Sequence, residues 1–162
     1  MSEFKLEQFK GAAIDLPCLY GRRGKELVNA LMVRMPGKLA LVDVFGRPRH
    51  RILSSLITKQ VVTHFPDARI IIGQQGEASD NPFQEAAAAL AIEAEDMLAV
   101  VGHGRGLYAA KGCGAVVVAL TYGLSPESFI GGHDGPGPDL WAHDIAGLKE
   151  QLGLESFCLP QP

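Results

Sequence analysis

The chain has 162 residues, of which 47% are apolar and 20% charged, and its net charge is −3. This length suits one soluble domain that buries roughly two-thirds of its unfolded surface. The chain has no basic field for nucleic acid or an anionic membrane, and no apolar run approaches the roughly 20 residues that span a bilayer. The charged start lacks a secretory core and the three distant cysteines form no CxxC pair, so a cytoplasmic protein with free thiols is expected.

The first half of the chain alternates short apolar runs with segments of helical periodicity. Leu27, Val28 and Leu31, for example, follow helical spacing with one buried stripe. Pro-Gly and Pro-Asp pairs end the two predicted helices. In chain order we expect a strand at 10–16, a helix at 25–35, a strand at 38–44, a helix at 49–65 and a strand at 69–72.

The second half repeats this alternation after a polar loop. Asp80 or Asn81 is expected to cap the next helix, with Pro82 as its first residue. A Gly/Pro-rich loop is predicted at 124–139, and Gly153 ends the last helix. The predicted elements are a helix at 83–92, a strand at 97–101, a helix at 107–111, a strand at 115–120, a short edge strand at 139–142 and a helix at 144–152.

The alternation predicts an α/β fold: a Rossmann-like, doubly wound, mainly parallel sheet of about five strands with helices on both faces. No repeat or linker divides the chain, so we expect one domain over 1–162, with a tail at 153–162 that is partly ordered at best. Ligands in such sheets bind at the carboxyl ends of the strands. The residues that follow each strand are therefore the candidates for function.

The segment GHGRG, residues 102–106, follows one predicted strand and precedes a helix. Its spacing fits the G-x-S-x-G nucleophile elbow, but Gly104 stands where the nucleophile would be, which excludes that chemistry. Backbone N–H groups at the helix start, beside Arg105, could instead cradle a phosphate. A tight turn without a ligand fits the pattern at least as well.

Other polar residues leave functional and structural interpretations open. Asp15 ends the first strand, where a carboxylate can act as a nucleophile, bind a metal or cap a turn. Cys18 could be a reactive thiol, although no partner base is identifiable. The His-Asp pairs at 133–134 and 143–144 lack metal-ligand spacing, so loop and cap roles are expected for them.

Taken together, these segments resemble the haloacid dehalogenase-like (HAD) hydrolases, in particular the phosphoglycolate phosphatase-like branch. FKGAAIDLPCLY is similar to the opening φφφDxDGT of that family, and KLALVDVFGRPRHRI to its second strand. The segment from GQQGEASDNP to AVVG is similar to GKPxPDPFxxAxxxLGxxPxxxLxVGD, and GHGRGLYAAKGCGAVVVALTYG to GDSxxDxxAAxxAGxxxVxVxxG. The resemblance covers nearly the whole chain and implies the fold of these phosphatases.

The resemblance also implies roles for single positions. In the family the first Asp attacks phosphorus and the Asp two residues later is the general acid/base. These positions hold Asp15 and Pro17, and Pro17 cannot transfer a proton. The Ser or Thr that holds the phosphoryl group aligns with Asp43 or, given a local insertion, Val44. The phosphate-binding Lys aligns with Glu77.

The acidic residues that bind magnesium in the family align with His103 and Gly106. Phosphoryl transfer depends on neutralising the phosphate charge, which acidic residues in the pocket oppose. We therefore expect no cofactor, and Mg²⁺ only if residual family chemistry survives. The residues expected to line the pocket are Asp43, Glu77, Gly102 and Arg105.

In this branch a substrate cap is inserted soon after the first motif, but only residues 19–24 stand there, so a capless core is expected. A second copy or another protein would then cover the open pocket. One hypothesis is a pseudoenzyme that acts in binding, assembly or regulation. The alternative is a hydrolase with rewired chemistry on a phosphate or halo-acid substrate, with Asp15 as nucleophile or base, His103 as acid/base and Arg105 as anion clamp.

Overall fold

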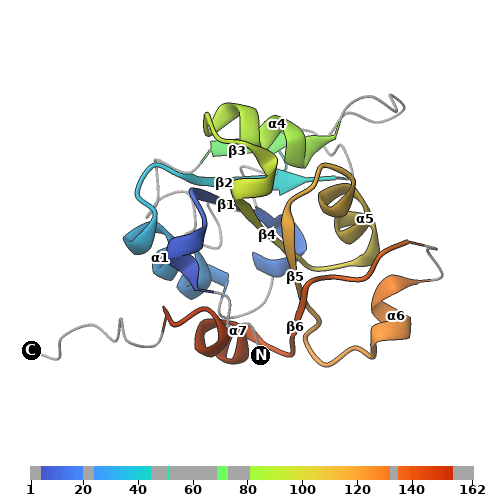
Figure 1. Ribbon diagram of the computed structural model, residues 1–162. Helices are drawn as coiled ribbons and strands as arrows, with labels where there is room; N and C mark the ends of the chain where they lie inside the picture. Colours follow the sequence, from blue (N-terminus) through green and yellow to red (C-terminus); the bar gives the residue numbers. More distant parts are fainter. Residues whose placement is uncertain are drawn as a thin grey trace, which may run out of the picture.

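The computed structural model describes residues 5–19, 24–44, 51, 69–72, 81–131 and 135–154 (Figure 1). Within these residues six strands form one sheet in the order β3-β2-β1-β4-β5-β6, and every neighbouring pair is parallel. The strands are β1 (Gly11–Asp15), β2 (Leu39–Asp43), β3 (Arg69–Ile72), β4 (Met97–Val101), β5 (Val116–Leu120) and β6 (Leu140–Ala142).

This topology confirms the predicted α/β class and the Rossmann-like parallel sheet. Where about five strands were expected, the described sheet has six, the sixth being the short edge strand. The segment suggested as a short edge strand pairs with β5, from Val118 opposite Leu140 to Leu120 opposite Ala142. The direction of winding reverses between β1 and β4, which is where ligands bind in folds of this kind.

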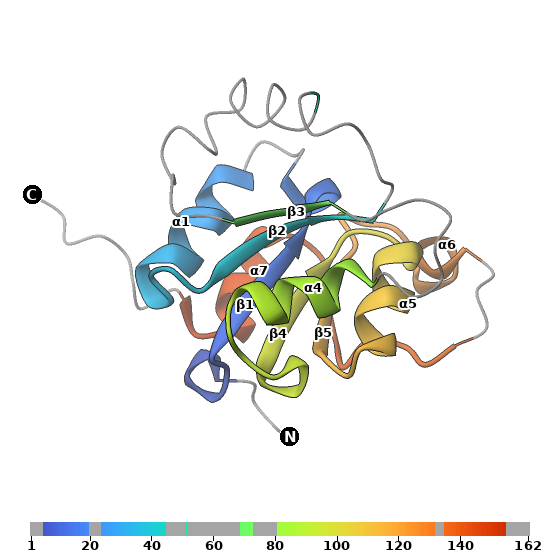
Figure 2. The same cartoon turned by 90° about the horizontal axis from the view of Figure 1, so that it is seen from above.

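Helices cover both faces of the sheet, which is why β1, β2 and β4 are buried along their whole length. On one face, α1 (Gly24–Arg34) and α7 (Ile145–Gln151) pack on alternate strand residues such as Ile14, Leu41 and Val100. On the other face, α4 (Pro82–Ala89) and α5 (Gly104–Gly112) pack on the residues between them (Figure 2). Period-2 alternation thus divides the core into two layers.

Local signals place most helix ends. Asn81 caps α4 through its Oδ1, which accepts the N–H groups of Phe83 and Gln84. Asp144 caps α7 by accepting the N–H of Gly147 at 2.7 Å, as expected for the second His-Asp pair. Three short 3₁₀ turns complete this part of the fold: η1 (Leu6–Gln8), η2 (Leu16–Leu19) and η3 (Ala94–Asp96).

Three element predictions were wrong in their extent. A short helix, α6 (Pro126–Ile130), lies inside the predicted Gly/Pro-rich loop; Ser125 caps it, and its Phe129 packs edge-on against Trp141. α5 begins at Gly104, so the GHGRG segment enters the helix and does not form a turn before it. α4 ends at Ala89, ahead of Ala91 with its positive φ of 58°.

The helix expected at 49–65, apart from residue 51, and the tail beyond residue 154 lie outside the described residues. So do residues 73–80 and the first His-Asp pair, at 133–134. Among the helices that the structure describes, none has the length and apolar character to cross a membrane.

Candidate functional site

The carboxyl ends of β1 and β4 meet at the winding reversal and bring Asp15 beside Gly102. Ile14 pairs in register with Val100, so the residues that follow these strands lie at the same edge. Asp15 is fully buried, and the N–H of Gly102 donates to its Oδ2 at 3.2 Å. A buried carboxylate needs such donors to offset the loss of its hydration. Asp15 is therefore a buried residue at the edge of the sheet where the strands have their carboxyl ends.

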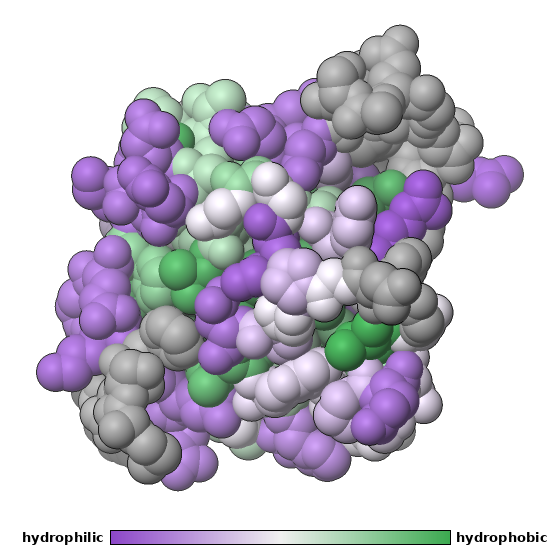
Figure 3. Space-filling view, turned by 45° about the vertical axis from the view of Figure 1, so that its right-hand side comes forward, coloured by the Kyte–Doolittle hydropathy of each residue, from purple (hydrophilic) through white to green (hydrophobic). Residues whose placement is uncertain are grey.

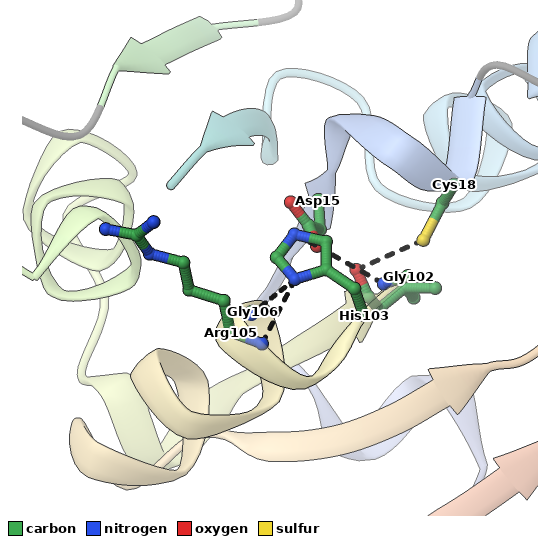
Figure 4. Close-up of polar contacts among 7 residues, drawn as sticks. Asp15, Cys18, Gly102, His103, Arg105 and Gly106 are labelled. Atoms are coloured by element: carbon green, nitrogen blue, oxygen red, sulfur yellow. Dashed lines mark hydrogen bonds and ion pairs between the residues drawn. The ribbon is translucent and has the colours of Figure 1, made fainter. Parts of the chain in front are cut away.

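His103 links Asp15 to α5 (Figure 4). It is the N-cap of α5, and its Nδ1 accepts the N–H groups of Arg105 at 3.1 Å and Gly106 at 3.2 Å. An accepting Nδ1 carries no proton, so the neutral ring carries its proton on Nε2. Nε2 lies 3.2 Å from Oδ2 of Asp15, although the N–H direction is poorly aligned with that oxygen.

Glycines allow this close packing. A Cβ on Gly106 would overlap Oδ2 of Asp15, so no acidic side chain fits there with Asp15 in its present position. A Cβ on Gly104 would lie 2.6 Å from the carbonyl oxygen of Ile130 and 2.9 Å from that of Phe129. The start of α5 thus sits directly against the end of α6 and the carboxylate of β1.

The structure brings together only some of the residues predicted to form the pocket. Asp43 is buried at the end of β2, one residue beyond Val42, which pairs with Asp15. The side chain of Arg105 is exposed and points away from Asp15 (Figure 4), and its role as an anion clamp stays a prediction. Glu77 lies outside the described residues.

Cys18 has the surroundings of an inert thiol. Its side chain is fully buried, and Sγ lies 3.7 Å from the carbonyl oxygen of Val100. Burial, with a further contribution from the negative charge of Asp15, raises the pKa of the Cys18 thiol well above its ordinary value. Because the thiolate is the reactive form, Cys18 is protected from chemistry in this conformation.

Tyr122, which no sequence pattern indicated as a candidate, also contacts this region. Its hydroxyl donates to the carbonyl oxygen of Cys18 at 2.6 Å, across 104 residues of chain. The available signal was Gly123, a residue type common in turns, which follows the end of β5 at Leu120 by three residues, at the edge of the sheet where ligands bind.

The magnesium site implied by the resemblance does not fit the residues present. Of its aligned acidic positions, Gly106 has no side chain, and His103 directs one ring nitrogen to backbone N–H groups and the other toward Asp15. Mg²⁺ prefers several oxygen ligands in octahedral geometry. Among the residues that the structure describes, no group of three or more His, Cys, Asp or Glu side chains could hold a metal ion.

No protein-family model and no curated protein match this sequence. Solved structures do match. The chain overlays on a proposed HAD-family hydrolase from Streptomyces avermitilis with a TM-score of 0.65 and 9% identity, over 96% of this chain and 91% of the other. It overlays on the cobalt-bound deoxy-D-mannose-octulosonate 8-phosphate phosphatase from Haemophilus influenzae with a TM-score of 0.58 and 13% identity, over 94% and 87%.

A predicted phosphoglycolate phosphatase from Haemophilus somnus matches with a TM-score of 0.57 and 20% identity. That match covers 79% of this chain but 55% of the other, so the chain spans little more than half of that protein. These overlays show that the chain has the fold of the HAD phosphatases and hydrolases, as the resemblance in sequence implied.

Proposed function

We propose that this HAD-fold protein has lost phosphatase chemistry and acts in binding, assembly or regulation. The observation that carries the proposal is the arrangement of His103, whose two ring nitrogens face α5 and Asp15 and leave neither facing a substrate. In a catalytic Asp–His pair, the carboxylate orients one nitrogen and the other meets the reacting group. Here the second nitrogen caps a helix.

The position of Asp15 supports the same proposal. A nucleophile must come close to phosphorus in line with the leaving group. Asp15 has no exposed surface, and its Oδ2 is directed at the N–H of Gly102 and at His103. Pro17 occupies the position of the general acid/base and cannot supply the rate acceleration of about 10²–10⁴-fold that such a group typically contributes.

A second candidate is the rewired hydrolase, which the Asp15–His103 contact of 3.2 Å favours. A carboxylate beside an imidazole is a recurrent acid–base pair in enzymes. This function requires His103 to leave its capping position, because Nδ1 is engaged with Arg105 and Gly106 in the present one. The non-catalytic function requires no such movement and is therefore the better supported of the two.

Turnover assays on wild type and Asp15→Asn test the proposal. The panel comprises phosphate monoesters, 2-halo acids and phosphonates, each with and without Mg²⁺. Asp96→Asn is the matched control, because Asp96 precedes β4 at the opposite edge and pairs with Lys10 at 3.4 Å. We expect all three proteins to give the same background rate. Turnover that Asp15→Asn abolishes and Asp96→Asn retains would establish the rewired hydrolase.

The partner of such a protein is proposed to be a second copy or another protein, in the cytoplasm. Cys18 and Cys113 are both free thiols, consistent with a reducing compartment. On the face seen in Figure 3, hydrophobic areas alternate with hydrophilic ones. The large exposed apolar side chains among the described residues are Val33, Tyr108, Tyr122 and Leu124. The partner is thus proposed from the functional argument, and no surface is assigned to it.

A further inference from the structure

The turn that follows β5 holds a bulky residue in a conformation that favours glycine or asparagine. Tyr122 has a φ of 51° and Gly123 a φ of 90°, and the N–H of Leu124 donates to the carbonyl oxygen of Thr121 at 3.1 Å. These values fit a type I′ turn, whose first central position is usually Asn, Asp or Gly. A tyrosine there carries backbone strain, which persists only where other contacts outweigh it.

The side chain of Tyr122 provides such a contact. The residue is 44% exposed, yet its hydroxyl donates to the carbonyl oxygen of Cys18 at 2.6 Å. A tyrosine hydroxyl is protonated at neutral pH and can therefore donate; burial raises the pKa of the Tyr122 hydroxyl further above its ordinary value. The strained turn is therefore tied to η2, the 3₁₀ turn that directly follows Asp15.

The other side of η2 rests on the end of β4. A Cβ on Gly102 would lie 3.1 Å from the backbone nitrogen of Cys18, 3.1 Å from Cβ of Pro17 and 3.2 Å from Sγ of Cys18. Such distances are tighter than most Cβ contacts, so η2 packs closely against the glycine backbone and would have to shift by a few tenths of an ångström to admit a Cβ. η2 is thus held between Gly102 and the hydroxyl of Tyr122.

We propose that Tyr122 is a latch that holds η2 closed against Gly102, and that release of its hydrogen bond is the motion that exposes Cys18 and Asp15. The strain in the Tyr122 backbone favours release, and the hydrogen bond to Cys18 opposes it. This device controls access to the sheet edge whether or not Asp15 takes part in catalysis, so it can be tested independently of the proposed function.

Alkylation of Cys18 by iodoacetamide reports the opening of η2, because the closed state buries this thiol completely. The test uses the full chain with Cys113→Ser and Cys158→Ser, so that Cys18 is its only thiol. Tyr122→Phe removes the hydroxyl alone. We expect Cys18 of this variant to be alkylated about three- to ten-fold faster than in the background protein, which carries only the two cysteine substitutions. This range corresponds to the loss of one net hydrogen bond.

Two further variants separate latch release from general loosening. Val117→Ala shortens a fully buried side chain of β5 in the core layer on the opposite face of the sheet from the η2 residues and Cys18. If urea denaturation gives the two variants the same free energy of unfolding, we expect Cys18 to be alkylated more slowly in the β5 variant than in Tyr122→Phe. Tyr122→Asn removes the hydroxyl but also relieves the strain that favours release, so it should label no faster than Tyr122→Phe. Labelling of Tyr122→Phe at the rate of the background protein, labelling of Tyr122→Asn faster than Tyr122→Phe, or labelling of Val117→Ala as fast as Tyr122→Phe at equal stability would overturn the latch.

Discussion

At the scale of single residues, His103 takes over structural tasks at a position where the resemblance expects a magnesium ligand. A helix start leaves N–H groups without partners inside the helix, and the Nδ1 of His103 accepts two of them. The same ring presents Nε2 to the buried charge of Asp15. One side chain therefore contacts both α5 and Asp15. Its removal should lower the free energy of unfolding by more than the loss of a helix cap alone.

Substitution of His103 separates these two contributions. His103→Ala removes the cap and the neighbour of Asp15, and we expect the free energy of unfolding to fall by about 2–3 kcal/mol. His103→Asn retains an N-cap acceptor but is too short to keep the contact with Asp15, so its loss should be smaller, about 1 kcal/mol. Urea denaturation of both variants measures the difference. An alanine variant as stable as wild type would show that the ring has no structural role.

At the scale of elements, the junction of α5 with α6 explains why glycine stands at the start of a helix. Glycine normally destabilises a helix relative to alanine, by about 1 kcal/mol. At Gly104, however, the nearest atoms to an added Cβ are the backbone oxygens of Ile130 and Phe129, which cannot move as a side chain would. Close approach of α6 therefore outweighs helix propensity at this position.

A pair of glycine substitutions in α5 tests this explanation. Gly104→Ala should lower the free energy of unfolding by about 1–3 kcal/mol, because the new methyl group overlaps backbone atoms. Gly112→Ala is the matched control: the nearest atom to its Cβ is Nδ2 of Asn81 at 3.6 Å, an ordinary contact. The free energy of unfolding of this variant should rise by about 0.5–1 kcal/mol. If both variants gained stability in thermal or urea unfolding, the α5–α6 junction would not constrain Gly104.

Elements with strong local signals could be predicted from the sequence, and contacts distant in sequence could not. β4 and β3 were predicted with the bounds found, because short β-branched apolar runs identify buried strands. α6 was hidden by the glycines and prolines around it, although Ser125 and Pro126 form a helix-start signal. The bond between Gly102 and Asp15 joins residues 87 apart, and only the parallel register brings them together.

At the scale of the whole molecule, the fold has the strand arrangement at which ligands bind, but the polar residues at that point contact one another. The strand order reverses between β1 and β4, as in ligand-binding Rossmann-like sheets. At this point Asp15 is buried against Gly102 and His103, and η2 packs over Gly102. We therefore predict that the protein is a stable scaffold with the phosphatase fold and has no site for phosphoryl transfer.

Thermal unfolding with Mg²⁺ and orthovanadate, a mimic of five-coordinate phosphorus, tests this prediction most directly. A ligand that binds only the folded protein raises the Tm, and the rise grows with the logarithm of the ligand concentration above its Kd. For wild type and for Asp15→Asn we measure the change in Tm relative to the ligand-free sample of the same protein. We predict that this change is the same for both proteins at every concentration of the two ions. A rise in the Tm of wild type that requires both ions and is absent from Asp15→Asn would contradict the account, because it would show a working phosphoryl-transfer site at Asp15.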